Sequence, residues 1–139
     1  MKNYFPNKST STLQKKMLIQ PFFVDQRLKS KKIIKGMGNN YSWSQSTIIE
    51  GIESDLKKGI KNFLLFIVPK EKQKLPENFS YHYEVIRNLK KEFHKDITLL
   101  VDTCLCSITP DGHCGISHKK KIDLNQTHYA LGLAANTYL

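Results

Sequence analysis

Apolar runs of strand length alternate along this chain with segments of helical periodicity, and this alternation restricts the fold more than any other feature. The runs at 18–24, 62–68 and 97–106 are apolar almost throughout, as strands buried on both faces are. Each run is followed by a stretch in which apolar residues recur every three or four positions. Repeats of this kind form parallel sheets covered by helices, so the sequence predicts an α/β fold.

Three helices are predicted, one after each strand. Their start signals are Ser42 with Gln45, which together make a capping box, then Ser80, then Asn125. Gly59 marks the end of the first helix, and a basic loop precedes that helix up to about Asn40. The apolar sides are, in order, Ile48, Ile52, Leu56 and Ile60; His82, Ile86, Leu89 and Phe93; and Ala130, Leu133, Ala134 and Tyr138.

The chain divides into a polar start and one α/β unit. Residues 1–16 carry Pro6 and a Ser/Thr cluster and show no period, which predicts an irregular arm that needs a partner surface, while 17–139 form the α/β unit. No apolar run approaches the roughly 20 residues of a membrane helix, and the start lacks the apolar centre of a secretory signal. We therefore expect a cytoplasmic location and no membrane partner.

A formal charge of +10 raises the question of nucleic-acid binding. Of the 22 basic residues, however, only Arg27 and Arg87 are arginine, the residue favoured for bidentate contacts to phosphates and bases. A solvated lysine surface explains the charge equally well, and no nucleic-acid partner is predicted.

The chemistry is concentrated between Asp102 and Gly115. On a strand, Asp102, Cys104 and Cys106 would project to the same side, and a loop with Gly112 and Gly115 can return Cys114 to them. Three thiolates suit zinc and leave a fourth position for water or substrate. Two alternatives stay open: a closed structural site with a histidine, His113 or His118, as fourth ligand, and buried cysteines without metal. His82, His94 and His128 lie on predicted helices and are assigned no site.

The segment Val101-Asp-Thr-Cys-Leu-Cys-Ser-Ile-Thr-Pro-Asp-Gly-His-Cys-Gly115 resembles the zinc-binding signature of porphobilinogen synthases, the 5-aminolevulinate dehydratases. The runs 18–24 and 65–69 are similar to the first two strands of that family. The resemblance implies about the first three β/α units of a TIM-type barrel, with an N-terminal arm that embraces a neighbouring subunit in a homo-oligomer, usually an octamer. It also implies roles for six residues: zinc ligands Cys104, Cys106 and Cys114, active-site carboxylate Asp102, pocket wall Phe66, and His113 in support of the metal's ligand shell.

The family reaction joins two 5-aminolevulinate molecules to porphobilinogen, using one lysine as a Schiff base and a second to bind substrate. No lysine here matches either, so we expect an N-terminal fragment that is inactive without a complementing chain. The alternative is a non-catalytic zinc-binding or assembly module. The sequence departs from the family pattern at Pro110-Asp111, where Ser-His is usual, at Ile67, where Gly is usual, and in a short loop at 70–78.

Overall fold

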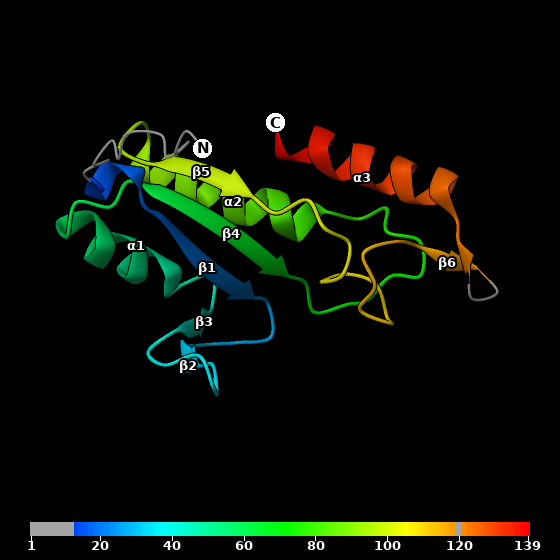
Figure 1. Ribbon diagram of the computed structural model, residues 1–139, viewed down its shortest axis with the longest axis horizontal. Coiled ribbons are helices and arrows are strands. Elements are labelled where there is room, and N and C mark those ends of the chain that lie inside the picture. Colours follow the sequence, from blue (N-terminus) through cyan, green and yellow to red (C-terminus); the bar gives the residue numbers. More distant parts are fainter. Residues whose placement is uncertain (1–12, 119–120) are drawn as a thin grey trace, which may run out of the picture.

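A five-stranded sheet lies at the centre of the computed structural model, which describes residues 13–118 and 121–139 (Figure 1). The strand order is β2-β3-β1-β4-β5. β1 is parallel to β3 and β4, and β4 is parallel to β5, whereas β2 is antiparallel to β3. The predicted α/β class with a parallel sheet is therefore confirmed. The strands are Ile19–Asp25 (β1), Lys32–Ile33 (β2), Tyr41–Trp43 (β3), Asn62–Val68 (β4) and Thr98–Val101 (β5).

Helices follow three of the parallel strands. α1 (Ile48–Lys57) leads into β4, α2 (Ser80–Phe93) leads into β5, and α3 (Leu124–Tyr138) closes the chain. A short 3-10 helix, Lys15–Met17, precedes β1, and a small hairpin of β6 (Ser117–His118) and β7 (Lys121–Ile122) precedes α3. Among residues 13–118 and 121–139, no helix is both long and apolar enough to cross a membrane.

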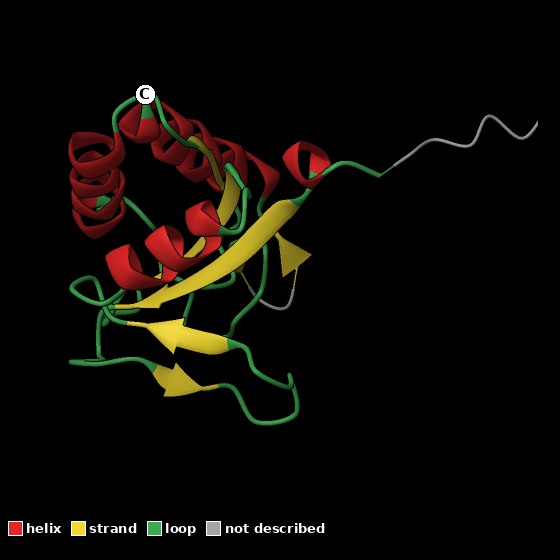
Figure 2. Cartoon of the chain, turned by 90° about the vertical axis from the view of Figure 1, so that its left-hand side faces the viewer, coloured by secondary structure: helices red, strands yellow, loops and turns green. Residues whose placement is uncertain are grey.

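The main core lies between the sheet and the two helices α1 and α2, which cover the same side of it (Figure 2). In β4, Phe63, Leu65 and Ile67 are buried against these helices, while the alternate residues are half-buried. The prediction of a strand buried on both faces is wrong for β4, because within the described residues helices cover one face only. The sheet members of this core are Phe22, Val24, Phe63, Leu65 and Ile67, and its helical members are Ile48, Ile52, Tyr81, Val85, Ile86, Leu89 and Phe93.

The basic loop predicted up to Asn40 contains a strand pair instead. β2 and β3 form a hairpin, and β3 joins the sheet beside β1, where Phe23 is level with Ser42. Strands of two and three residues are too short to show a period in the sequence. Ser42 therefore lies in a strand and does not cap α1, which begins six residues later after a turn held by the Ser44 and Thr47 side chains.

The other helix ends agree with the sequence more closely. Gly59 follows α1 with a φ of +91°, the left-handed conformation that ends many helices. Ser80 is the first residue of α2 and donates its N–H to the Asn78 side chain, so it is not itself the cap. Asp123, not Asn125, caps α3 by accepting the Gln126 N–H at 3.0 Å.

The third strand is shorter than predicted. β5 ends at Val101, although the Asp102 N–H still donates to the Leu65 carbonyl at 3.0 Å. Beyond Asp102 the chain turns, because Leu105 and Ile108 enter a second core beneath α3 with Phe79, Ile116, Ala130 and Ala134. The predicted arm at 1–16 lies outside the described residues except for its last four.

Candidate metal centre

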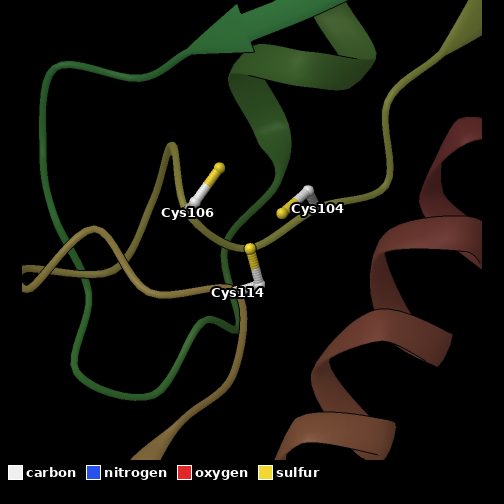
Figure 3. Close-up of side chains that lie close together, drawn as sticks. All are labelled: Cys104, Cys106 and Cys114. Carbon is white, nitrogen blue, oxygen red and sulfur yellow. The ribbon is translucent and has the colours of Figure 1, made fainter.

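A turn directly after β5 carries two of the three cysteines. Leu105 and Ile108 are fully buried and fasten this turn to α3, while Cys104 and Cys106 on either side of Leu105 stay half-buried. The chain then forms an exposed loop that begins at Pro110 and turns back, and the returning segment of this loop carries Cys114. The three thiols face one another across the gap between these two segments (Figure 3).

The three sulfur atoms are close enough to share one metal ion. All the Sγ atoms of Cys104, Cys106 and Cys114 lie within 4.8 Å of one another. Tetrahedral zinc with bonds of about 2.3 Å holds its sulfurs about 3.8 Å apart, so a small contraction would close this cluster on the ion. Cys104 and Cys106 were expected to meet because they share a strand face, and that reason is wrong, since the strand ends at Val101 and a turn brings them together. Cys114 was expected to return to them by a loop, as the structure shows.

Hydrogen bonds within the cluster make the three thiols unequal. Burial raises the pKa of Cys104, but hydrogen bonds from the Cys106 backbone N–H and from the other two thiols leave that pKa below its usual value. Burial and the hydrogen bond to Cys104 raise the pKa of Cys106 to about 11. The pKa of Cys114 is also raised, because its thiol is hydrogen-bonded to Cys104 and lies near the negative charge of the Cys104 thiolate. Cys104 ionises first, and a bound cation would deprotonate the other two.

The family can now be identified from comparison with known proteins. The model of the family described as "Delta-aminolevulinic acid dehydratase" matches residues 5–138. The chain belongs to this family. The assignment agrees with the signature at 101–115, which is the segment that carries the three grouped thiols.

Curated members of the family match most of this chain. The delta-aminolevulinic acid dehydratase of Methanothermus sociabilis is 35% identical over 121 residues, which are 84% of this chain and 37% of that protein. The Archaeoglobus fulgidus enzyme of the same name is 32% identical over 125 residues, 85% of this chain and 38% of the relative. The chain thus spans little more than a third of the length of these relatives.

A solved structure confirms the fold. The chain superposes on the Toxoplasma gondii delta-aminolevulinic acid dehydratase, determined with the reaction product porphobilinogen, with a TM-score of 0.84 and 26% identity. The match covers 91% of this chain and 38% of the solved one. The prediction of a partial TIM-type barrel is therefore confirmed: this sheet corresponds to part of a barrel and is itself open, with β2 and β5 at its edges.

The departure from the family pattern at Pro110-Asp111 has a structural role in the returning loop. The Asp111 carboxylate accepts the His113 N–H at 3.2 Å and the Ser117 hydroxyl at 3.1 Å. Hydrogen bonds from the His113 N–H and the Ser117 hydroxyl also lower the pKa of Asp111. Gly112 adopts a φ of +70°, which lets the loop reverse before Cys114. Asp111 therefore stabilises the tight loop that returns Cys114.

The histidines considered as a fourth ligand lie outside the cluster. Within the part of the chain that the structure describes, the thiol cluster contains the three cysteines alone. His113 precedes Cys114 and is exposed, and its Nδ1 accepts the Gly115 N–H at 3.0 Å. His118 is exposed in β6. The geometry favours a three-thiolate site over a closed site with a histidine.

Asp102 directly follows β5, and Phe66 lies in the neighbouring strand β4. Leu65 of β4 is level with Val101 of β5, so the residues that follow them, Phe66 and Asp102, are at adjacent positions, Phe66 still within β4 and Asp102 just beyond β5. The Asp102 carboxylate is close enough to raise the pKa of Cys106 and Cys114, a minor effect after burial and the hydrogen bonds to Cys104. Phe66 stacks on Phe23 with 5.0 Å between ring centroids.

A second loop supports the cysteine turn and was not found from the sequence. The Gln73 N–H donates to the Ile108 carbonyl at 2.8 Å, and Lys72 Nζ donates to the Ser107 carbonyl at 2.5 Å. The Gln73 side chain in turn holds its own loop by bonding to Glu77 and Asn78. These contacts join residues 35 positions apart, and no local pattern signals them.

Proposed function

We propose that this chain takes part in the condensation of two 5-aminolevulinate molecules to porphobilinogen, as the part of the enzyme that holds the metal. The observation that carries the proposal is the group of three thiols within 4.8 Å. Membership of the family supports it, as does the structural likeness to an enzyme solved with porphobilinogen. The proposed pathway is tetrapyrrole, and hence heme, biosynthesis.

Zinc is the proposed metal, held by Cys104, Cys106 and Cys114. Soft thiolate ligands favour zinc over the hard cations magnesium and calcium, and three of them leave one position free. Bound there, zinc would supply Lewis-acid polarisation of a substrate oxygen. Reduced thiols also require a reducing compartment, which supports a cytoplasmic location.

The remaining residues have proposed roles around that metal. Asp102 adds a carboxylate beside the thiols, where it can hold or move a proton of the substrate amine. Phe66, stacked on Phe23, provides an apolar wall that orients substrate. His113 would support the ligand shell of the metal from its place beside Cys114.

The lysines of the reaction are proposed to come from further polypeptide. A lysine that forms a Schiff base needs a lowered pKa, which burial in an apolar pocket provides. Every lysine among the described residues is exposed. We propose that this sheet works together with the additional strands of a complete barrel. Residues 1–16 are the proposed arm, and a homo-oligomer is the proposed assembly.

Metal titration tests the proposed centre. Competition with a chromophoric chelator should show one zinc per chain, and each of Cys104→Ser, Cys106→Ser and Cys114→Ser should weaken binding at least about a hundredfold, because each removes one of three ligands. His118→Ala is the matched control, since His118 is an exposed metal-binding residue type outside the cluster, and it should bind as the parent does. Equal affinity in the cysteine variants and the parent would rule the site out.

A further inference from the structure

We propose that Thr109 is the positioning residue of this metal centre, because its buried hydroxyl fixes the two segments that carry the thiols relative to each other. The inference rests on the proposed function. Thr109 is 2% exposed and lies between Cys106 and Cys114 in the sequence, three and five positions from them. It is proposed as a positioning residue and not as a ligand, because its hydroxyl is turned to two backbone carbonyls.

The hydroxyl of Thr109 touches one peptide group in each segment. Its Oγ1 donates to the His113 carbonyl at 2.8 Å and lies 3.2 Å from the Leu105 carbonyl. The His113 carbonyl belongs to the peptide group whose N–H is that of Cys114, and the Leu105 carbonyl to the one whose N–H is that of Cys106. The hydroxyl thus fixes the plane of the His113–Cys114 peptide, and so the direction of the Cys114 side chain, relative to the turn that carries Cys106.

Besides this hydroxyl, a backbone hydrogen bond from the Gly112 N–H to the Thr109 carbonyl, at 3.3 Å, joins the returning segment to the turn. Pro110, Asp111, Gly112, His113 and Cys114 are all exposed, and burial begins again only at Gly115. The Asp111 contacts to His113 and Ser117 lie within the loop and do not reach the turn that carries Cys104 and Cys106. Apart from the thiols themselves, Thr109 makes the one side-chain hydrogen bond between 104–109 and 113–115 in the described part of the chain.

The Leu105 end of this contact is rigid. Leu105 and Ile108 are fully buried under α3, the Leu105 carbonyl also accepts the N–H groups of Ile108 and Thr109 at 2.9 Å, and the Gln73 N–H bonds to the Ile108 carbonyl. Because the Thr109 hydroxyl belongs to this rigid turn, its hydrogen bond to the His113 carbonyl holds the exposed segment in place. Without this hydrogen bond, the segment that carries Cys114 would become ordered only when the metal binds, and the entropy lost in that ordering would lower the affinity for the metal.

Three variants isolate the hydroxyl. Thr109→Val keeps the shape and removes the hydrogen bond, and Thr109→Ser keeps the hydroxyl. Thr137→Val is the matched control, because the Thr137 hydroxyl bonds to the Leu133 carbonyl at 2.8 Å within α3 and to neither segment that carries a cysteine. Zinc affinity by chelator competition should fall about 10- to 100-fold in Thr109→Val, recover to within about threefold in Thr109→Ser, and stay unchanged in Thr137→Val.

The cobalt-loaded forms supply a readout that a general loss of stability would not change. We expect the thiolate-to-cobalt absorption bands to weaken or shift in Thr109→Val and to return in Thr109→Ser, while thermal unfolding of the metal-free Thr109→Val stays as close to the parent as that of Thr137→Val. Should Thr109→Val not fold, Thr109→Ala, which only removes atoms, takes its place with the same expected result. A folded variant that binds zinc as tightly as the parent, or a Thr109→Ser as weak as Thr109→Val, overturns the inference. A parent chain that binds no zinc refutes the proposed metal centre instead.

Discussion

Given 5-aminolevulinate and zinc, the isolated chain should produce no porphobilinogen above the blank. Enzymes accelerate their reactions by about a millionfold or more, and the proposed reaction depends on covalent catalysis by lysine. All described lysines are exposed, and the sheet that carries the thiols is open at β2 and β5. In the proposed roles, the metal polarises substrate and Asp102 moves protons, and neither can form the imine. Product is best measured by mass spectrometry.

The matched test adds the part of a barrel to which this chain has no match. When the chain is mixed with the region of the Methanothermus sociabilis relative that it does not match, we expect turnover to appear. Cys104→Ser or Asp102→Asn in this chain should then abolish it, and His118→Ala should not. Product from the isolated chain, with substrate trapped by borohydride on one lysine, would contradict the assignment of the lysines to further polypeptide.

The largest expected loss of stability comes from Phe63→Ala. Phe63 is fully buried in β4, the strand between β1 and β5, and its ring meets Phe22 edge-on with 5.8 Å between centroids. Removing such a side chain costs about 3–5 kcal/mol of the roughly 5–15 kcal/mol by which small domains are stable. Urea denaturation should therefore show a much lower midpoint, or no folded baseline.

Tyr129→Ala is the control for this substitution. It also removes an aromatic ring, but from an exposed site on α3, where Tyr129 is 60% exposed and alanine is a good helix former. Its midpoint should stay close to that of the parent. If both variants lost the same stability, the packing between sheet and helices described above would be incorrect.

The elements whose apolar residues recur with a regular period could be predicted from the sequence. The runs that became β1 and β4 were predicted to within two residues, and the apolar sides of α1 and α2 pack on the sheet as expected. His82 was assigned no site, and it is buried against Phe79 and Tyr138, where burial lowers its pKa to about 4. The spacing of apolar residues predicts such elements because it shows which face of a helix or strand is buried.

Contacts between distant segments could not be predicted. Nothing near Tyr41 and Trp43 shows that they form a strand, since β1 supplies the partner. The apolar run up to Cys106 looks like one strand, but Leu105 belongs to a different core from Val101, beneath α3. Cys104 and Cys106 were grouped correctly for a reason that proved wrong, whereas the loop that returns Cys114 was predicted. The support from Gln73 and Thr109 depends on contacts of the folded loops and could not be predicted.

X-ray absorption at the zinc edge tests the central claim most directly, because it counts the atoms bound to the metal. For the zinc-loaded chain, the account predicts three sulfurs at about 2.3 Å and one lighter atom at about 2.0 Å, the open position that substrate would occupy. A first shell of four sulfurs, which one chain with three cysteines cannot supply, or a shell of nitrogen and oxygen alone, would contradict it.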